Sequence, residues 1–217
     1  MSPHPPSKPV DKRFLVTDAR FVLGVVEAGS MPTSDLPEVA FAGRSNVGKS
    51  SLLNALVQRR GLARTSSTPG CTRQINVFDL RFADASELRV VDLPGFGYAR
   101  RSKQERVQWG TLIEGYLKGR EKLVMLVLLV DARRGLEEEE LQLLDFMRSL
   151  RGAEFPCVCV VTKTDKLPKA EAGRAIDAAG RKAGRKALGF SAKTGDGREA
   201  LWRAIRRVVV PESAPAV

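Results

Sequence analysis

The sequence predicts an α/β fold in which helices cover both faces of a mostly parallel sheet. Two observations support this prediction. Apolar segments of strand length alternate along the chain with longer segments whose apolar residues recur at helical spacing. In addition, each polar or glycine-rich motif directly follows an apolar segment, as in a doubly wound sheet that binds ligands at the carboxyl ends of its strands.

The predicted strands differ in apolar character. The strand predicted at residues 122–130 is continuously apolar after Lys122, which is typical of the buried centre of a parallel sheet. Residues 74–82 and 87–91 are separated only by the polar link 83–86, so we predict a hairpin and one antiparallel strand at the sheet edge. The complete prediction has six strands, at residues 38–42, 74–82, 87–91, 122–130, 155–161 and 187–190.

Five helices are predicted between and after these strands. Residues 136–150 carry an apolar stripe that contains Leu143, Leu144, Met147 and Leu150. The closing helix, at residues 196–209, turns a similar stripe inward. The remaining predicted helices are 49–58, a segment that ends near residue 118, and the basic segment 169–186.

The length of 217 residues suits one domain with a substantial core. We predict a flexible lead-in at residues 1–20, a single domain at residues 21–210 and a disordered tail at residues 211–217. Residues 1–9 lack the apolar stretch of a secretory signal. The longest apolar run, at residues 123–130, is far shorter than the roughly 20 residues that span a bilayer, so we expect no stable membrane insertion.

The net charge of +11 and the pI of about 10 favour a polyanionic partner, either nucleic acid or an anionic membrane surface. The alternative is a basic protein without such a partner. Cys157 and Cys159 alternate within an apolar segment, which favours two core-facing thiols and a reducing, cytoplasmic setting. The only histidine, His4, lies in the predicted lead-in, so we expect no histidine base.

The most specific motif follows the strand predicted at residues 38–42. The run Gly43-Arg44-Ser45-Asn46-Val47-Gly48-Lys49-Ser50 matches G-x-x-x-x-G-K-[ST], a loop whose backbone N–H groups cradle phosphates. Its glycines permit the tight curl, Lys49 reaches the β- and γ-phosphates, and Ser50 binds Mg²⁺. A glycine-rich turn without this function is the alternative, but a strand before the loop and a helix after it favour the phosphate loop.

A second motif, Asp92-Leu93-Pro94-Gly95, follows the strand predicted at residues 87–91. A carboxylate at Asp92 can hold Mg²⁺ through a water molecule. The N–H of Gly95 can meet the γ-phosphate and move when that phosphate leaves. Alone this motif is an ordinary turn, but downstream of a phosphate loop it indicates a nucleotide switch.

Two further segments predict a base-reading site. Asp165, in Thr162-Lys163-Thr164-Asp165, can accept two hydrogen bonds from guanine N1 and N2, a donor pair that adenine lacks. The stem of Lys163 can pack on the base. The loop Phe190-Ser191-Ala192 can meet guanine O6 through its backbone. A lone K-x-D is more often a surface charge pair, so the order of all four motifs indicates GTP.

Together these motifs predict a three-layer P-loop NTPase fold with a Ras-like G domain. The sequence resembles the EngB (YihA/YsxC) family of ribosome-biogenesis GTP-binding proteins, in the TrmE–Era–EngA–EngB group. The resemblance covers about residues 35–209, and Thr162 also fits this family, where most GTPases have Asn. The motifs that carry it are residues 37–56, 67–74 and 92–99.

The resemblance implies further site residues. Thr72, in the first switch loop, would ligate Mg²⁺ beside Ser50, with Thr68 as a competing candidate. Thr72, Lys49 and Gly95 are the expected catalytic residues. Cys71 stands where the family often has a basic residue, so the charge there departs from the pattern. Residues of this loop expected to contact the nucleotide are Gly70, Cys71, Thr72, Arg73 and Gln74.

Two departures from Ras-like enzymes affect the expected activity. Phe96 stands where those enzymes have a water-orienting glutamine, so we expect slow intrinsic hydrolysis. The resemblance implies that Asn46 ligates K⁺ in compensation, while an Asn that stabilises the loop turn is the alternative. Thr162 replaces an amide that ties the guanine loop to the phosphate loop, so we expect nucleotide affinity in the micromolar range.

Positive charge gathers in two clusters that we interpret as candidate contacts for ribosomal RNA phosphates. Solvated faces without a partner are the alternative. The first cluster follows the second switch, so γ-phosphate could gate its contact with RNA. Its members are Arg100, Arg101, Lys103 and Arg106, and the second cluster contains Lys182, Arg185, Lys186, Arg203, Arg206 and Arg207.

The resemblance implies a GTPase switch that acts in assembly of the large ribosomal subunit and is needed for normal cell division and septation. A GTP-dependent binding module that acts directly at the division septum is the alternative. We expect a cytoplasmic monomer that hydrolyses GTP to GDP with Mg²⁺, with K⁺ as a second cation. Its expected partners are the large ribosomal subunit and its rRNA.

Overall fold

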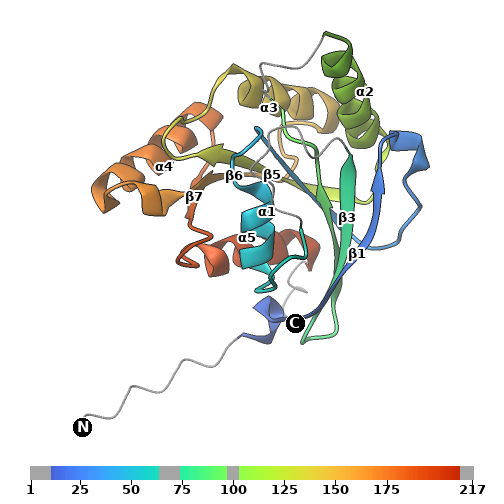
Figure 1. Cartoon of the computed structure of the whole chain (residues 1–217), viewed down its shortest axis with the longest axis horizontal. Helices are drawn as coiled ribbons and strands as arrows, with labels where there is room; N and C mark the ends of the chain where they lie inside the picture. The colour runs from blue at the N-terminus through green and yellow to red at the C-terminus, as the bar shows by residue number, and fades with distance from the viewer. Residues whose placement is uncertain (1–10, 64–73, 97–102, 211–217) are drawn as a thin grey trace, which may run out of the picture.

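A seven-stranded sheet with five α-helices around it forms the part of the chain that the computed structural model describes (Figure 1). The described residues are 11–63, 74–96 and 103–210, and for residues 103–109 only the helical backbone is described. The order of strands across the sheet is β1 (Val16–Val25), β3 (Ile75–Phe82), β4 (Glu87–Asp92), β2 (Glu38–Gly43), β5 (Leu123–Asp131), β6 (Cys157–Thr162) and β7 (Ala187–Phe190). Strand β3 is antiparallel to its neighbours β1 and β4, and the other neighbouring pairs are parallel.

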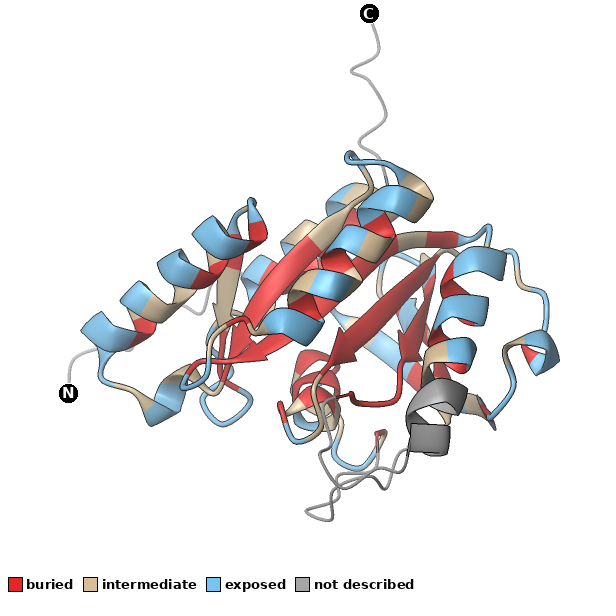
Figure 2. Ribbon diagram, turned by 90° about the horizontal axis from the view of Figure 1, so that it is seen from above, coloured by how far each residue is buried: buried red, intermediate tan, exposed pale blue. Residues whose placement is uncertain are grey.

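Helices form a layer on each face of this sheet. Helices α1 (Lys49–Leu56) and α5 (Arg198–Val209) bury Leu52, Leu53 and Trp202 in the core on one face. Helices α2 (Lys103–Gly119), α3 (Glu138–Arg151) and α4 (Lys169–Ala183) share the core on the other face. Strands β2 and β5 are buried along almost their whole length between these layers (Figure 2), as their continuous apolar sequence predicts.

Helix α5 is hydrogen-bonded to the carboxyl end of helix α1. Trp202 Nε1 and Arg198 Nε each donate to the backbone carbonyl of Leu56, at 3.0 Å. Leu56 is the final residue of α1, where carbonyl groups lack intrahelical partners. Helix α5 therefore completes the hydrogen bonding of the helix that starts at Lys49.

The predicted three-layer α/β fold with a mostly parallel sheet is confirmed, but two details were wrong. The sheet has seven strands rather than six, and the antiparallel strand β3 lies inside the edge because β1 covers it. Residues 12–14 form a short 3-10 helix and residues 16–20 belong to β1, so the predicted flexible lead-in does not extend to residue 20. Two irregularities in the β1–β3 register break the alternation that would reveal β1 in the sequence.

Two helices differ from their predicted bounds because glycines adopt left-handed backbone conformations. Helix α4 ends at Ala183 rather than residue 186, where Gly184 has φ 66° and donates its N–H to the carbonyl of Arg181. Helix α5 begins at Arg198 rather than residue 196, after Gly197 with φ 83°. Within the described residues, every helix is too short or too polar to cross a membrane.

Candidate functional site

The predicted site segments gather at the carboxyl edge of the sheet, where strands β2, β4, β5, β6 and β7 end. The phosphate loop follows β2, and the segment after Asp92 follows β4. The two segments predicted to read guanine follow β6 and β7. Parallel strands thus deliver segments that lie far apart in the sequence to one end of the sheet.

The phosphate loop curls through two left-handed residues, Asn46 at φ 63° and Gly48 at φ 102°. Helix α1 starts immediately after it, and Leu52 N–H donates to the carbonyl of Gly48 at 2.8 Å. A side chain at Gly43 would meet the Leu129 carbonyl of β5 at 2.9 Å, so only glycine allows this approach. The loop thereby places the amino end of α1, a favourable position for anions, at the mouth of the site.

Lys49 and Asp92 meet beneath the phosphate loop. Their Nζ and Oδ1 atoms are 2.5 Å apart, and the two side chains are 8% and 2% exposed. Lys49 opens α1 and Asp92 closes β4, so two separate motifs place opposite charges side by side. The ammonium predicted to bind phosphate and the carboxylate predicted to hold Mg²⁺ through water are therefore adjacent.

The segment after Asp92 runs along the phosphate loop. Ser45 N–H donates to the carbonyl of Phe96 at 2.8 Å, and Phe96 N–H donates to the carbonyl of Gly43 at 3.3 Å. A Cβ atom at Gly95 would lie 3.0 Å from the Ser45 backbone, so glycine permits this close approach. Leu93, Pro94 and Gly95 are buried in this arrangement. The N–H of Gly95 thus belongs to a segment in contact with the loop, as its predicted role requires.

Ser50 and Asp92 provide the kind of oxygen ligands that Mg²⁺ prefers. Within the described residues, three or more acidic, histidine or cysteine side chains nowhere gather around a common metal position. A hydroxyl and a single carboxylate fit a metal that takes most of its remaining ligands from phosphate and water. The chemistry of Ser50 and Asp92 therefore fits Mg²⁺ bound together with a nucleotide.

Thr162 connects the end of β6 to the phosphate loop. Its Oγ1 lies 2.7 Å from the carbonyl of Val47 and 3.2 Å from that of Val130, and its hydroxyl proton can serve one of them at a time. We expected that a threonine here would leave the guanine loop poorly tied. The shorter contact shows that the hydroxyl still spans the two loops, and the expected micromolar affinity stays a prediction.

Lys163 makes a second connection to the phosphate loop. It has φ 59°, an uncommon left-handed conformation for this residue type, and its Nζ donates to the carbonyl of Asn46 at 2.5 Å. A Cβ atom at Gly48 would lie 3.5 Å from Lys163 Cε, so the side-chain stem runs over this glycine. The same Nζ donates to Asp131 Oδ2 at 2.9 Å. One ammonium thus joins three loops.

The two segments predicted to read guanine also touch each other. Ser191 Oγ donates to Asp165 Oδ1 at 2.7 Å, and Thr194 N–H donates to Ser191 Oγ at 3.2 Å. Ser191 is buried, whereas Asp165 and Ala192 are exposed. The hydroxyl of Ser191 therefore holds one oxygen of an otherwise exposed carboxylate. Phe190 packs into the core behind this contact.

The sequence analysis missed Asp131, which closes β5. Arg133 donates to this carboxylate from its backbone N–H, Nε and Nη2, at 3.0, 3.0 and 2.8 Å. Burial would raise the pKa of Asp131, but the hydrogen bonds from Arg133 and Lys163 outweigh it and hold the pKa well below its ordinary value. The available signal was the presence of three charged residues, Asp131, Arg133 and Arg134, directly after a predicted apolar strand.

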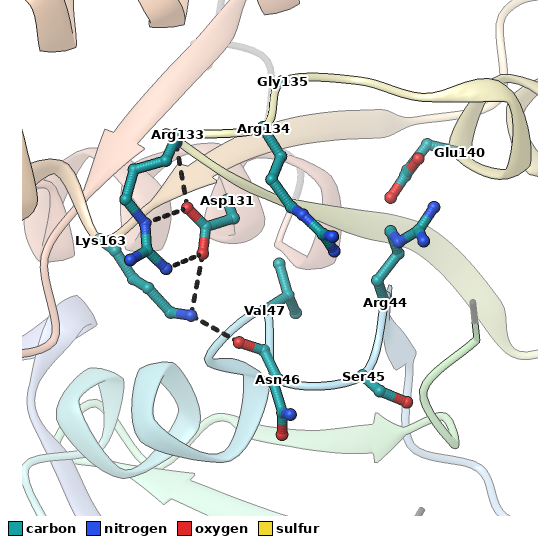
Figure 3. Close-up of a pocket in the computed structure, with 10 residues that line it drawn as sticks. All are labelled: Arg44, Ser45, Asn46, Val47, Asp131, Arg133, Arg134, Gly135, Glu140 and Lys163. Carbon is teal, nitrogen blue, oxygen red and sulfur yellow. Dashed lines mark hydrogen bonds and ion pairs between the residues drawn. The ribbon is translucent and has the colours of Figure 1, made fainter. Parts of the chain in front are cut away.

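A cavity of about 160 Å³ lies between the phosphate loop and the loop that follows β5 (Figure 3). Its walls include Val47, Asp131, Arg134 and Glu140. Arg44, predicted as a nucleotide contact, pairs instead with Glu137 and Glu139 of the α3 end at 2.7 and 2.9 Å. The predicted contact of Arg44 with the nucleotide stays a prediction. Figure 3 also shows the amide of Asn46 pointing away from Lys163.

Part of the predicted site lies outside the described residues. This applies to the switch residues Thr68, Gly70, Cys71, Thr72 and Arg73, whose predicted roles stay predictions. Gln74, which follows them, donates from Nε2 to Asn76 Oδ1 at 2.9 Å. This contact gives no evidence for the predicted nucleotide contact of Gln74.

Comparison with known proteins defines the family. A family model described as 50S ribosome-binding GTPase matches residues 38–163, more than half of the chain. A probable GTP-binding protein EngB from Trichlorobacter lovleyi is 46% identical over 198 residues, which cover 90% of this chain and 96% of the relative.

The chain belongs to the EngB family of GTP-binding proteins.

Other EngB proteins and solved structures agree with this assignment. The probable EngB protein of an Anaeromyxobacter species is 42% identical over 93% of this chain and 95% of its own length. The crystal structure of a probable GTP-binding protein engB has 26% identity and a TM-score of 0.62, covering 79% of this chain and 98% of that one. Era of Aquifex aeolicus bound to GDP and aluminium fluoride shares the fold, with 24% identity, a TM-score of 0.67 and coverage of 85% and 60%.

The second predicted basic cluster of this EngB-family chain is smaller than its sequence suggests. Arg206 is buried, pairs with Asp84 and lies over the ring of Phe82 at 4.7 Å. Arg185 Nη1 donates to the carbonyl of Cys157 at 3.1 Å, and Lys182 Nζ donates to that of Leu136 at 2.7 Å. Helix periodicity could not reveal these contacts with other elements. The side chains of the first cluster lie outside the described residues.

Proposed function

We propose that this EngB-family GTPase is a slow GTP-hydrolysing switch that acts in assembly of the large ribosomal subunit. The observation that carries the proposal is the joining of the base-reading and phosphate-binding segments. Thr162 and Lys163 both bond to carbonyls of the phosphate loop, while Asp165 lies in the same short segment. One GTP molecule can therefore contact both segments at once.

The proposed substrate contacts follow from the chemistry of each segment. The backbone N–H groups of residues 43–50 and the ammonium of Lys49 would hold the phosphates. Asp165, oriented by Ser191, would accept the N1 and N2 protons of guanine, and ATP would leave this carboxylate unpaired. The stem of Lys163, fixed over Gly48, would cover one face of the base.

For hydrolysis, positioning and charge stabilisation would do most of the work. Ser50 and Asp92, with Thr72 of the undescribed switch segment, would hold Mg²⁺, which supplies charge neutralisation on the phosphate oxygens. The N–H of Gly95 would contact the γ-phosphate. Phe96 is buried against the phosphate loop and carries no polar group that could orient water, so intrinsic turnover would be slow.

An added cation or partner would raise this rate. Asn46 is exposed at the crest of the phosphate loop and carries the one side-chain amide of that loop. We propose it as a ligand for K⁺, because a cation there would stabilise charge that develops on the phosphates. Turnover should rise when K⁺ replaces Na⁺, and an Asn46→Ala variant should lose this dependence. Equal rates in both salts would contradict the K⁺ role.

The proposed partner is the large ribosomal subunit with its rRNA, in the cytoplasm, and the proposed active form is a monomer. The description of the matching family model and the net charge of +11 support this partner. A solved Era structure, similar in fold, includes a segment of 16S ribosomal RNA. A requirement in cell division and septation would then follow from ribosome supply.

Co-sedimentation of the full chain with ribosomal subunits on sucrose gradients tests this function. We expect the chain to travel with large subunits in the presence of GTP or a non-hydrolysable analogue, and to remain at the top with GDP. Absence from the subunit fractions in every nucleotide state would refute the ribosomal role. Binding to division-site components instead would favour the septum alternative.

The Asp165→Asn variant makes the same experiment specific for the nucleotide. An amide there pairs with xanthine rather than guanine, because it reverses the donor and acceptor roles. We expect the variant to join large subunits with xanthosine triphosphate and to fail with GTP. Retention of GTP preference would show that Asp165 does not read the base.

A further inference from the structure

Asp131 holds an unusual position among the three loops of the site. Its side chain is 8% exposed, and its two oxygens accept four hydrogen bonds. Three come from Arg133, which is two residues away, and one comes from Lys163. Residues of the turn itself therefore satisfy most of this carboxylate, while one oxygen is shared with the guanine loop.

The contact with Lys163 matters because of what else that ammonium touches. Lys163 Nζ donates to the carbonyl of Asn46 in the phosphate loop and to Asp131 at the end of β5. A lysine ammonium is a point charge on a flexible stem, and fixing that stem costs rotamer entropy. Two acceptors from different strands limit the positions that this ammonium can take, as Figure 3 shows.

We propose that Asp131 is a positioning residue for nucleotide binding, which acts by holding Lys163 across the phosphate loop. This inference rests on the proposed function, because it assumes that the stem of Lys163 packs on the guanine base. Asp131 itself does not touch the base in this proposal. Its carboxylate holds the Lys163 side chain in position before the nucleotide binds, so binding does not have to order that side chain.

The charge balance supports this role. Two cations, from Arg133 and Lys163, meet one carboxylate, and their hydrogen bonds keep Asp131 ionised throughout the physiological pH range. An Asp131→Asn change keeps the shape and one carbonyl acceptor, but it removes the charge that holds the ammonium. Lys163 would then have neutral carbonyl oxygens, including that of Asn46, in place of a charged acceptor.

The expected effect falls on nucleotide release. The side chain of Lys163 is 28% exposed, so solvent partly screens its contact with Asp131. We expect Asp131→Asn to weaken GDP and GTP about tenfold each, mainly through faster release. Because the change acts on binding alone, KM should rise while kcat stays within twofold.

A double-mutant cycle separates this role from a local one. Fluorescent GDP release is measured for the wild type, Asp131→Asn, Lys163→Ala and the double variant, together with thermal unfolding without nucleotide. If Asp131 acts through Lys163, the double variant should release GDP no more than twofold faster than Lys163→Ala. If the increases in the GDP release rate of the two single variants multiply in the double variant, the proposal is overturned. It is also overturned if Asp131→Asn releases GDP at the wild-type rate.

Asp84 provides a matched control at the opposite edge of the sheet. Its Oδ1 accepts the N–H of Ser86, two residues on, and its other oxygen pairs with the buried Arg206. Asp84→Asn therefore removes a carboxylate from the same kind of turn, away from the nucleotide loops. We expect a lower unfolding temperature and unchanged GDP release. Faster release in Asp84→Asn would mean that general loosening explains the Asp131 result.

Arg133→Gln keeps the test decisive if Asp131→Asn fails to fold. This change removes the two side-chain donors of Arg133 but leaves its backbone N–H and the Asp131–Lys163 contact. The rate of GDP release should stay within twofold of wild type. A tenfold increase would show that Asp131 acts by stabilising its own turn through Arg133, and not by holding Lys163. Failure of the wild type to bind fluorescent GDP would instead refute the proposed function.

Discussion

The two edges of the sheet both contain buried ion pairs, but they differ in what the pairs connect. At the amino edge, the fully buried Glu38 at the start of β2 accepts from Tyr116 Oη at 3.1 Å and pairs with Arg120. Arg120 also donates to the carbonyl of Pro32 at 3.0 Å. At the carboxyl edge, Lys49 pairs with Asp92 and Lys163 pairs with Asp131.

The charged and polar groups of the amino-edge cluster bond mainly to one another. Burial, the charge of Glu38 and the hydrogen bond to Glu38 raise the pKa of Tyr116 well above its ordinary value, so its hydroxyl remains a donor. The cluster joins the end of α2 to the start of β2, and its groups serve each other. The carboxyl-edge pairs lie instead where loops from separate strands converge. Convergence of loops, rather than burial of charge, therefore distinguishes the functional edge.

The largest expected effect tests the amino edge. Replacing Glu38 by Ala leaves Arg120 and the Tyr116 hydroxyl without their shared acceptor, and breaking a buried pair costs about 3–5 kcal/mol. Urea unfolding should show a loss of about 4 kcal/mol, while GDP affinity stays within twofold. The exposed pair of Glu87 with Arg81 is the control, and Glu87→Ala should cost less than about 1 kcal/mol. A large change in affinity for Glu38→Ala would remove the distinction between the edges.

The next effect tests the carboxyl edge. Lys49→Ala removes the ammonium beneath the phosphate loop, so GDP and GTP affinity should fall more than a hundredfold, or about 3 kcal/mol. Fluorescent nucleotide titration measures this loss. Lys118→Ala removes a lysine from the exposed pair with Glu114 and should bind normally. Near wild-type affinity for Lys49→Ala would show that the phosphate site lies elsewhere.

A smaller effect concerns the tie between the loops. Thr162→Val keeps the shape but removes the hydroxyl donor to the Val47 carbonyl, so GDP release should be about tenfold faster. Thr17→Val, on β1, removes an exposed hydroxyl bond to the carbonyl of Arg81 on β3 and should leave release unchanged. Equal release rates for the two variants would mean that Thr162 does not couple the loops.

The last prediction concerns the two thiols of β6, which should leave nucleotide binding unaffected. Burial raises the pKa of Cys157 to about 11 and that of Cys159 to about 12, so both thiols remain protonated at pH 8. In a Cys71→Ser variant, iodoacetamide should label the native protein at least a hundredfold more slowly than the urea-unfolded chain. Rapid labelling of the native protein would show that this strand opens readily.

The sequence predicted contiguous features well and contacts across the chain poorly. Lys49 and Asp165 each stand in a short motif whose spacing implies its geometry, and the flanking strands have a simple apolar pattern. Asp131 and Lys163 are 32 residues apart, so their contact depends on the order of strands. The register shifts of β1 and the left-handed Gly197 alter element bounds through backbone geometry that periodicity does not encode.

The hydrogen bonds from α5 to the end of α1 have a consequence for synthesis of the protein. Arg198 and Trp202 emerge from the ribosome after nearly all of the domain, yet they complete the helix that carries the phosphate loop. A nascent chain that stops before α5 would therefore present its phosphate loop on an unfinished helix. We expect full affinity for GTP to arise only late in translation, once α5 supplies these two donors.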